Sequence, residues 1–279
     1  MKKQLKMNKL AVILVFTAMF LNVSCGMAEN KAKEKMVQIK TEFGTIKVKL
    51  FDETPQHRDN FLKLTGEGFY SDLLFHRVIK GFMVQGGDPN SKNAAPGQML
   101  GAGDLGYTIP AEINPKFYHR RGMLAAARQG DQVNPEKRSS ASQFYILQGK
   151  IFRPTELDSL QAKMEESRKN SMMQSRVKAI ESDLNKLNAE GKQVELMARI
   201  NAIRDTVTDL AAKLPPLKFS EEQRKIYTTV GGYPSLDNNY TIFGEVVEGM
   251  EIIDKIAALP VNKSNRPETD IKFTITELK

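Results

Sequence analysis

An arginine stands among large apolar residues in the stretch FHRVIKGFMVQGGDP, residues 75–89, which ends on a pair of glycines and a proline turn. Strand-like alternation predicts that Phe75 and Arg77 share one face and that His76 lies on the other. No nucleophile, metal-ligand cluster or acid–base pair accompanies Arg77 in this stretch. On the pattern alone, such an arginine is most often a solvated edge residue. The alternative is a reaction that needs a permanent cation on an apolar surface.

The rest of the sequence contains no well-supported motif for a conventional catalytic site. GAGDLG at 101–106 matches the glycine fingerprint of dinucleotide-binding proteins, but it neither follows a buried strand nor begins a helix, as that motif requires. The three histidines, His57, His76 and His119, lack metal-ligand spacing, and no cysteine cluster joins them. No Gly-x-Ser-x-Gly motif is present for a serine hydrolase. The sequence therefore predicts no metal site and no cofactor.

The charge of the chain is concentrated at its start. The 279 residues carry a formal charge of +8, with 41 basic and 33 acidic residues. Four lysines lie within the first 25 residues, which contain no Asp or Glu, and without them 37 basic residues face 33 acidic ones. This mild balance argues against nucleic acid or another polyanion as a partner.

The N-terminus has the pattern of an export signal. The lysine-rich MKKQLKMNK precedes the apolar run LAVILVFTAMFL, residues 10–21. This run is too short for a comfortable span of a bilayer core of about 30 Å, and it matches the apolar region of a signal peptide. LNVSC, which ends on Cys25, is similar to a bacterial lipobox, in which the cysteine is lipidated and becomes the new N-terminus. Asn22 departs from that pattern, and ordinary cleavage after Ala28 is the alternative.

We expect a lipoprotein-type signal peptide over residues 1–25 and a flexible tether over the polar residues 26–35. Lipidation of Cys25 would anchor the exported chain to a membrane. The predicted location is the bacterial cell envelope, facing the periplasm.

From residue 36 the chain consists of short alternating segments separated by glycine-rich turns, which predicts a mainly β domain. VQIKTEFGTIKVKLF predicts a hairpin about Phe43 and Gly44. TPQHRDNFLKLTGEG predicts a helix with Thr54 as its N-cap and Pro55 at its first position. A second short helix is expected at 251–258, before the closing strand IKFTITEL.

The pattern becomes helical between about residues 153 and 218. Apolar side chains recur at three- and four-residue spacing in two stripes, separated by Gly191 and ended by Pro215 and Pro216. This predicts two amphipathic helices that form an antiparallel hairpin, inserted into one domain of residues 36–279. The two stripes are Val177, Ile180, Leu184 and Leu187, and then Ile200, Ile203, Val207, Leu210 and Leu214.

Four motifs, FHRVIKGFMVQGGDP, GMLAAAR, SSASQFYIL and LDNNYTIFGEVVEGM, resemble in this order those of the cyclophilin family of peptidyl-prolyl cis-trans isomerases. The resemblance covers about residues 37–149 and 231–278. It implies an eight-stranded antiparallel β-barrel capped by two helices. It also implies an enzyme without a cofactor that accelerates rotation about Xaa–Pro bonds in unfolded or partly folded polypeptides.

The resemblance implies the site residues too. Arg77 matches the catalytic arginine. Tyr145 replaces the more usual phenylalanine, Tyr240 stands where many members carry histidine, and Arg128 occupies a position that is often an asparagine in contact with the peptide backbone. Ser235 replaces a tryptophan associated with cyclosporin binding, so strong sensitivity to that drug is not expected. The substrate groove is expected to comprise Phe82, Met83, Gln85, Ala127, Arg128, Gln143, Tyr145, Leu236 and Tyr240.

Two other functions stay open at this point. One is a client-binding chaperone that uses the helical insertion, with isomerisation secondary. The other is a structural role in which the insertion is a dimerisation or docking arm on an envelope complex. The sequence contains no signal for the client proteins, for the residue preferred before proline or for the oligomeric state.

Overall fold

Two strands with apolar residues at every second position form the first hairpin of the molecule. In the computed structural model, which describes residues 34–278, β1 (Met36–Thr41) pairs antiparallel with β2 (Gly44–Leu50). Val37 lies opposite Val48 and Ile39 opposite Ile46, and all four side chains are fully buried. The turn between the strands confirms the predicted hairpin. The predicted signal peptide, Cys25 and most of the tether lie outside the described residues.

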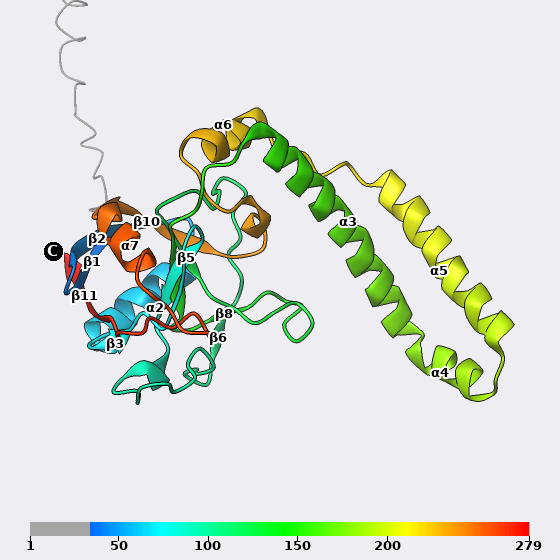
Figure 1. Ribbon diagram of the computed structural model, residues 1–279, viewed down its shortest axis with the longest axis horizontal. Helices are drawn as coiled ribbons and strands as arrows, with labels where there is room; N and C mark the ends of the chain where they lie inside the picture. Colours follow the sequence, from blue (N-terminus) through cyan, green and yellow to red (C-terminus); the bar gives the residue numbers. More distant parts are fainter. Residues whose placement is uncertain (1–33, 279) are drawn as a thin grey trace, which may run out of the picture. The chain divides into compact units, whose positions relative to one another are not determined.

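The remaining strands extend this hairpin into one curled antiparallel sheet of nine strands, in the order β3-β11-β1-β2-β10-β7-β9-β5-β4 (Figure 1). A separate two-stranded sheet pairs β6 with β8. The strands are β3 (Leu73–Leu74), β4 (Arg77–Ile79), β5 (Met83–Gly86), β6 (Thr108–Ile109), β7 (Met123–Ala126), β8 (Ser139–Ser140), β9 (Phe144–Leu147), β10 (Ile242–Glu248) and β11 (Lys272–Leu278).

Two helices contribute their apolar faces to the core of the sheet. α2 (Pro55–Gly66) buries Phe61, whose ring packs 5.5 Å from that of Phe144 and nearly perpendicular to it. α7 (Met250–Ala257) buries three isoleucines and packs against the same core. Both helices lie where the sequence predicted them, and the mainly β fold class is confirmed.

The strand count differs from the eight expected, because the described residues form eleven strands in two sheets. The predicted strand LFHRVI is divided into β3 and β4, with Phe75 and His76 outside both. The prediction that Phe75 and Arg77 share a face is therefore wrong. Phe75 packs in the core, with its ring centroid 4.5 Å from that of Phe273, because it lies in the link between β3 and β4, where the alternation of a strand does not apply.

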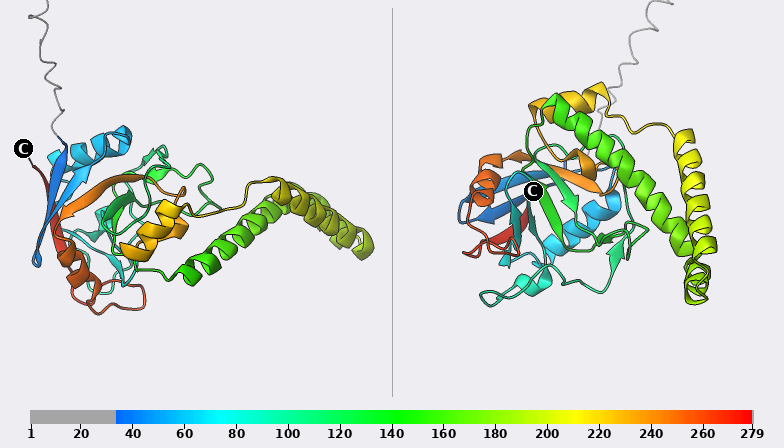
Figure 2. Two further views of the ribbon diagram at one scale, coloured as in Figure 1. Left: turned by 90° about the horizontal axis from the view of Figure 1, so that it is seen from above. Right: turned by 45° about the vertical axis from the view of Figure 1, so that its right-hand side comes forward.

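The predicted insertion is helical throughout most of its length. Residues 153–218 contain α3 (Pro154–Ala179), α4 (Glu181–Ala189) and α5 (Gln193–Lys213). A further helix, α6 (Glu221–Thr229), follows the predicted insertion and was not expected from the sequence. α3 and α5 lie side by side, and α4 and the turn at Gly191 join their ends, so the antiparallel hairpin is confirmed (Figure 2). The first predicted stripe crosses a break at Ile180, which ends α3 and begins α4. We call α3, α4 and α5 together the helical arm.

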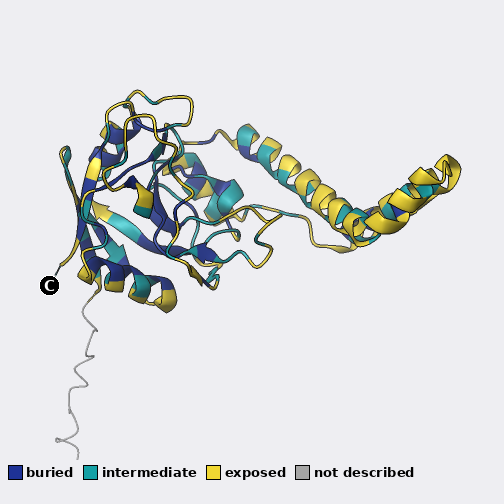
Figure 3. Cartoon of the chain, turned by 90° about the horizontal axis from the view of Figure 1, so that it is seen from below, coloured by how far each residue is buried: buried dark blue, intermediate teal, exposed yellow. Residues whose placement is uncertain are grey.

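The helical arm buries few side chains. Within α3, α4 and α5 only Leu157, Leu184, Val207 and Ala211 are buried, and most of the surface is exposed (Figure 3). Most of the predicted leucine and isoleucine stripe is only half-buried, because two helices alone cannot enclose an apolar face. Among residues 34–278, no helix combines the length and the apolar character needed to cross a membrane.

Candidate functional site

The site is built on β5, which lies between β4 and β9. Antiparallel pairing sets Arg77 of β4 opposite Gln85 of β5, and Gln85 opposite Tyr145 of β9. Residues that are directly opposite in neighbouring strands project on the same side of the sheet. The register thus puts a cation, an amide and a phenol in one row. Phe144 and Ile146 of β9 point to the core instead.

A chain of hydrogen bonds fixes the side chains in this row. Arg77 donates from a terminal guanidinium nitrogen to Oε1 of Gln85 at 3.0 Å, and Nε2 of Gln85 donates to Oε1 of Gln143 at 3.1 Å. Nε2 of Gln143 donates in turn to the carbonyl oxygens of Gly103 at 2.8 Å and Gly101 at 3.0 Å. The side-chain amides of Gln85 and Gln143 thus each accept a hydrogen bond from the residue before them in this chain and donate to the residue after them. This orientation leaves donors of Arg77 free to face a ligand.

Arg77 and Gln85 border a hollow of about 370 Å³. Every predicted groove residue except Gln143 lines this hollow. Gln143 is hydrogen-bonded to Gln85, which does line it. No carboxylate within residues 34–278 forms an ion pair with Arg77. The lining residues are His76, Arg77, Phe82, Met83, Gln85, Leu100, Gly101, Ala102, Ala127, Arg128, Tyr145, Leu236, Tyr240 and Ser264.

Apolar and aromatic side chains form the floor of this hollow and part of its walls. Met83 is 1 % exposed and Tyr145 is 5 % exposed, so both lie deep in the floor. The ring of Phe82 packs 4.2 Å from that of Tyr233, and the guanidinium carbon of Arg77 lies 6.0 Å from the centre of the Phe82 ring. The buried hydroxyl of Tyr145 has no hydrogen-bond partner, and its burial raises its pKa well above the usual value. The hollow therefore places the guanidinium of Arg77 beside buried apolar and aromatic side chains.

The comparisons with known proteins agree on the family. A model of the family "Cyclophilin type peptidyl-prolyl cis-trans isomerase/CLD" matches residues 36–214 and 220–278. The chain belongs to the cyclophilin family.

Two relatives and one solved structure show the extent of this similarity. The peptidyl-prolyl cis-trans isomerase of Synechococcus elongatus is 42% identical over 109 residues, which are 39% of this chain and 65% of the relative. The peptidyl-prolyl cis-trans isomerase-like 2 of Rhizopus delemar is 26% identical over 248 residues, 86% of this chain and 28% of the relative. The chain thus spans less than two thirds of either protein. A crystal structure of a cyclophilin type isomerase from Cryptosporidium parvum has a TM-score of 0.51 at 21% identity, covers 88% of this chain and 98% of its own, and shares the fold.

Arg128, which stands where cyclophilins often carry asparagine, has most of its guanidinium occupied. Its Nε donates to the carbonyl of Asn239 at 2.8 Å, and NH1 donates to the carbonyl of Gln129 at 2.9 Å and pairs with Asp131 at 2.6 Å. Its guanidinium carbon lies 4.5 Å from the centre of the Tyr240 ring. These contacts join the two loops on either side of the hollow. A contact of Arg128 with the substrate backbone stays a prediction.

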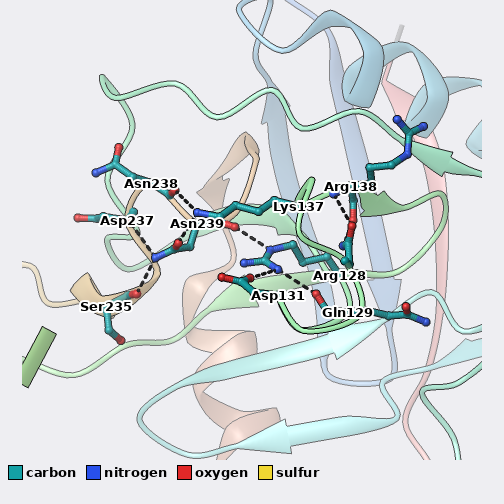
Figure 4. A network of polar contacts seen from close by, with 10 residues as sticks. Arg128, Gln129, Asp131, Lys137, Arg138, Ser235, Asp237, Asn238 and Asn239 are labelled. Atoms are coloured by element: carbon teal, nitrogen blue, oxygen red, sulfur yellow. Dashed lines mark hydrogen bonds and ion pairs between the residues drawn. The ribbon is translucent and has the colours of Figure 1, made fainter. Parts of the chain in front are cut away.

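Lys137 strengthens the same junction from further along its loop (Figure 4). Its ammonium group donates to Oδ1 of Asn239 at 2.7 Å and to the carbonyl of Asn238 at 3.3 Å. Asn239 donates onward to the carbonyls of Asp237 at 3.2 Å and Ser235 at 3.4 Å. We call residues 234–240, which carry Leu236 and Tyr240 of the groove, the wall loop.

The glycine-rich segment GAGDLG proved to be part of the site, which the sequence analysis missed. The carbonyls of Gly101 and Gly103 hold Gln143, and Asp88 accepts a hydrogen bond from the Gly101 amide. A side chain at Gly103 would place its Cβ 2.1 Å from Oδ1 of Asp88. Glycines that are unsuited to a dinucleotide fold can instead signal close backbone approach, and this signal was present.

A second hollow of about 550 Å³ adjoins the first and contains Gln143. The two share Gln85, Ala127 and Arg128, and Arg138 borders the second, where its side chain donates to Thr108. Gln143 therefore lines the second hollow rather than the first.

All three histidines are buried, and burial lowers the pKa of each. Burial lowers the pKa of His76 to about 4 and outweighs the opposing effect of Asp88, while the charges of Arg77 and Arg266 lower it further. The groove therefore keeps a neutral imidazole beside Arg77 near neutral pH. Within residues 34–278, no group of three or more potential metal ligands occurs.

We predict that the protein loses stability as the pH falls from 7.5 to 5. His76 takes up a proton in the unfolded chain below pH 6.5 but resists it in the folded protein down to about 4, so acid favours unfolding. This group alone should lower the free energy of unfolding by about 2 kcal/mol over that range. Urea unfolding at both pH values measures the change.

The matched variant for this prediction is His76→Leu, which keeps a buried apolar side chain and removes the titrating group. Its unfolding free energy should depend less on pH between 7.5 and 5. An acid dependence in His76→Leu as steep as in the wild type would contradict the assignment.

Proposed function

We propose that the groove is the active site of a prolyl cis-trans isomerase that acts on proline-containing segments of unfolded or partly folded polypeptides. The single observation that supports this most is the guanidinium of Arg77. Gln85 holds it beside an apolar hollow, and no carboxylate of residues 34–278 pairs with it. Family membership and the names of the relatives point the same way.

The reaction explains why a cation alone can suffice. An Xaa–Pro bond rotates over a barrier of roughly 18–20 kcal/mol, because rotation breaks the amide resonance. At the top of the barrier the amide is twisted, and the proline nitrogen regains a localised lone pair. A donor placed against that nitrogen stabilises the twisted state more than the planar one. Such differential binding is what accelerates a step.

The other groove residues have matching roles in this proposal. Arginine stays charged near neutral pH and has a planar set of donors, one of which Gln85 already orients. The twisted amide is less polar than the planar one, so an apolar floor such as Met83 and Tyr145 favours it. Phe82 and Leu236 would seat the proline ring, and Gln85 and Gln143 would bind the flanking backbone. No bond to the protein forms and no proton moves.

We further propose that the protein acts outside the cytoplasm, anchored by lipid to the bacterial envelope and facing the periplasm. The support is the lysine-rich start, the apolar run at 10–21 and the lipobox-like LNVSC at Cys25. Its substrates would then be exported chains that fold after crossing the membrane.

A second candidate function is the binding of such chains by the helical arm. Two apolar side chains of α5 support it, since Val194 is 86% exposed and Met197 is 51% exposed. The arm also contains Met164, Met172 and Met173 at half-buried positions. Flexible thioether side chains adapt to many apolar partners. In this role the arm would hold a client while the groove isomerises it; a dimerisation role of the arm stays a prediction.

We predict that Arg77→Ala lowers kcat/KM for an Xaa–Pro peptide by about a hundredfold to a thousandfold, the usual loss when one transition-state donor is removed. Arg77→Lys should recover little, because an ammonium group lacks the planar fork that Gln85 orients. NMR exchange spectroscopy on the peptide, with enzyme lacking residues 1–25, measures the rate.

Arg199→Ala is the matched control, because Arg199 is an exposed arginine on α5. It should retain the wild-type rate. A well-folded wild type without activity would refute the isomerase proposal, and full activity of Arg77→Ala would refute the role of this residue.

We predict that Cys25→Ser releases the protein from the membrane fraction of bacterial cells. Serine cannot carry the thioether-linked lipid, so the variant would lose its anchor. Fractionation of cells and metabolic labelling with a radioactive fatty acid measure the change. Equal partition and no label in the wild type would support ordinary cleavage after Ala28 instead.

We predict that the pair Val194→Glu and Met197→Glu weakens the suppression of client aggregation but leaves peptide isomerisation within twofold of the wild type. Charges on the exposed side chains would oppose apolar contacts there. Light scattering of an aggregating unfolded protein measures the first effect. The control is Gln193→Glu, an exposed position on the same helix. Unchanged suppression in the double variant would contradict client binding by this surface.

A further inference from the structure

The helical arm and α6 leave and rejoin the sheet at one narrow point. The amide of Lys150 donates to the carbonyl of Gly232 at 3.2 Å, and the amide of Gly232 donates to the carbonyl of Lys150 at 3.0 Å. Everything between these two residues is inserted. The amide of Phe152 donates to the carbonyl of Tyr227 at 2.9 Å, which fixes α6 against the start of the insertion.

One buried carboxylate connects α6 to the groove. Asp237, in the wall loop, is 6% exposed. Its Oδ1 accepts from the backbone amide of His119 at 2.7 Å and lies 3.0 Å from Nδ1 of the same residue. Its Oδ2 accepts from the hydroxyl of Tyr227 at 2.6 Å and from Nε2 of Gln223 at 3.1 Å. Half of the contacts of this carboxylate thus come from α6.

The carboxylate depends on these neutral donors. Within residues 34–278 its only basic partner is His119, and burial lowers the pKa of that imidazole, so it is neutral near pH 7. Because a carboxylate only accepts hydrogen bonds, the neutral ring must carry its proton on Nδ1. A buried charge without its donors is costly, so loss of Tyr227 or Gln223 would drive Asp237 to move.

Movement of Asp237 would displace side chains that line the groove. Leu236 is its neighbour in the chain, and both Leu236 and Tyr240 line the hollow beside Arg77. The ring of His119 lies 6.2 Å from that of Tyr240 and 6.5 Å from that of Tyr145. On its other side the wall loop is held by Arg128 and Lys137 (Figure 4). The loop is therefore held from two directions, and α6 shares one of them with His119.

We propose that Tyr227 and Gln223 are positioning residues of the isomerase. Through Asp237 they hold the wall loop in the conformation that completes the proline-binding groove. The helix at the end of the insertion is thereby part of the active-site support. The inference rests on the isomerase function proposed above.

The same helix is also attached to the arm. Arg224 of α6 pairs with Asp158 of α3 at 2.5 Å, and the fully buried Leu157 of α3 shares an apolar cluster with Tyr227 and Phe152. Tyr227 therefore contacts both the base of the helical arm and the wall loop. Its ring packs with Leu157 and Phe152, and its hydroxyl donates to Asp237.

Tyr227→Phe separates these two contributions, because it removes the hydroxyl and retains the ring. We expect KM for an Xaa–Pro peptide to rise about tenfold while kcat stays within twofold, as a displaced wall weakens binding but leaves Arg77 in place. Gln223→Met, which removes the second donor at similar volume, should raise KM less. The double variant Tyr227→Phe/Gln223→Met should raise KM more than either single substitution does.

Tyr118→Phe is the matched control. Tyr118 packs on the same cluster as Tyr227, but its hydroxyl makes none of the hydrogen bonds to Asp237. KM in this variant should stay within twofold of the wild type. NMR exchange at several peptide concentrations gives KM and kcat separately, and urea unfolding reports stability.

Each result has a defined meaning. A raised KM in Tyr227→Phe and not in Tyr118→Phe supports the positioning role. An unchanged KM with a lower apparent kcat and lower stability overturns it, because that pattern means only a smaller folded fraction. An unchanged KM and kcat in the double variant also overturns it. An inactive wild type would defeat the proposed function itself, which is a different outcome from active enzyme with an unaltered KM.

Discussion

The antiparallel pairing of β5 with both β4 and β9 is the constraint on which the site depends. It puts Arg77, Gln85 and Tyr145 in one row across three strands, whatever the loops around them do. A shift of one residue between β4 and β5 would turn Arg77 away from Gln85, and the same shift between β5 and β9 would turn Tyr145 away from it. The apolar residues of the opposite face, such as Val84 and Ile146, prevent that shift, since both are fully buried. The core thus specifies the register, and the register specifies the site.

A long insertion is compatible with this sheet because its two ends form a bonded pair. Lys150 and Gly232 exchange two backbone hydrogen bonds. The sheet domain therefore keeps its structure whatever the length of the segment between these two residues. Close approach demands glycine here, since a Cβ on Gly232 would lie 2.2 Å from the carbonyl oxygen of His119. Long loops between fixed ends add little entropic cost. The unusual feature is that the returning helix α6 also contributes donors to the groove.

The sequence predicted features that depend on local periodicity. The hairpin at Phe43, the helices α2 and α7 and the arm's two stripes all follow from spacing within about fifteen residues. It failed in the link between β3 and β4, at Phe75, because the alternation of apolar and polar residues in the sequence continues after the strand has ended. It also failed for contacts between distant segments. Gln143 binds Gly101 and Gly103, some forty positions earlier, and no periodicity encodes that pairing.

Tyr227 illustrates a further kind of failure, in which the two ends of one side chain have different roles. Beside the apolar residues of the insertion it resembles one more core aromatic, and its ring is indeed fully buried in that cluster. Only the fold shows that its hydroxyl ends at Asp237, which is near in sequence but belongs to the wall of the groove. In the proposed reaction no proton is transferred, and the imidazole of His76 beside Arg77 is neutral near pH 7. A site that works in this way would depend on position, so the residues that set position, Asp237 among them, would matter to it as much as those that touch the substrate.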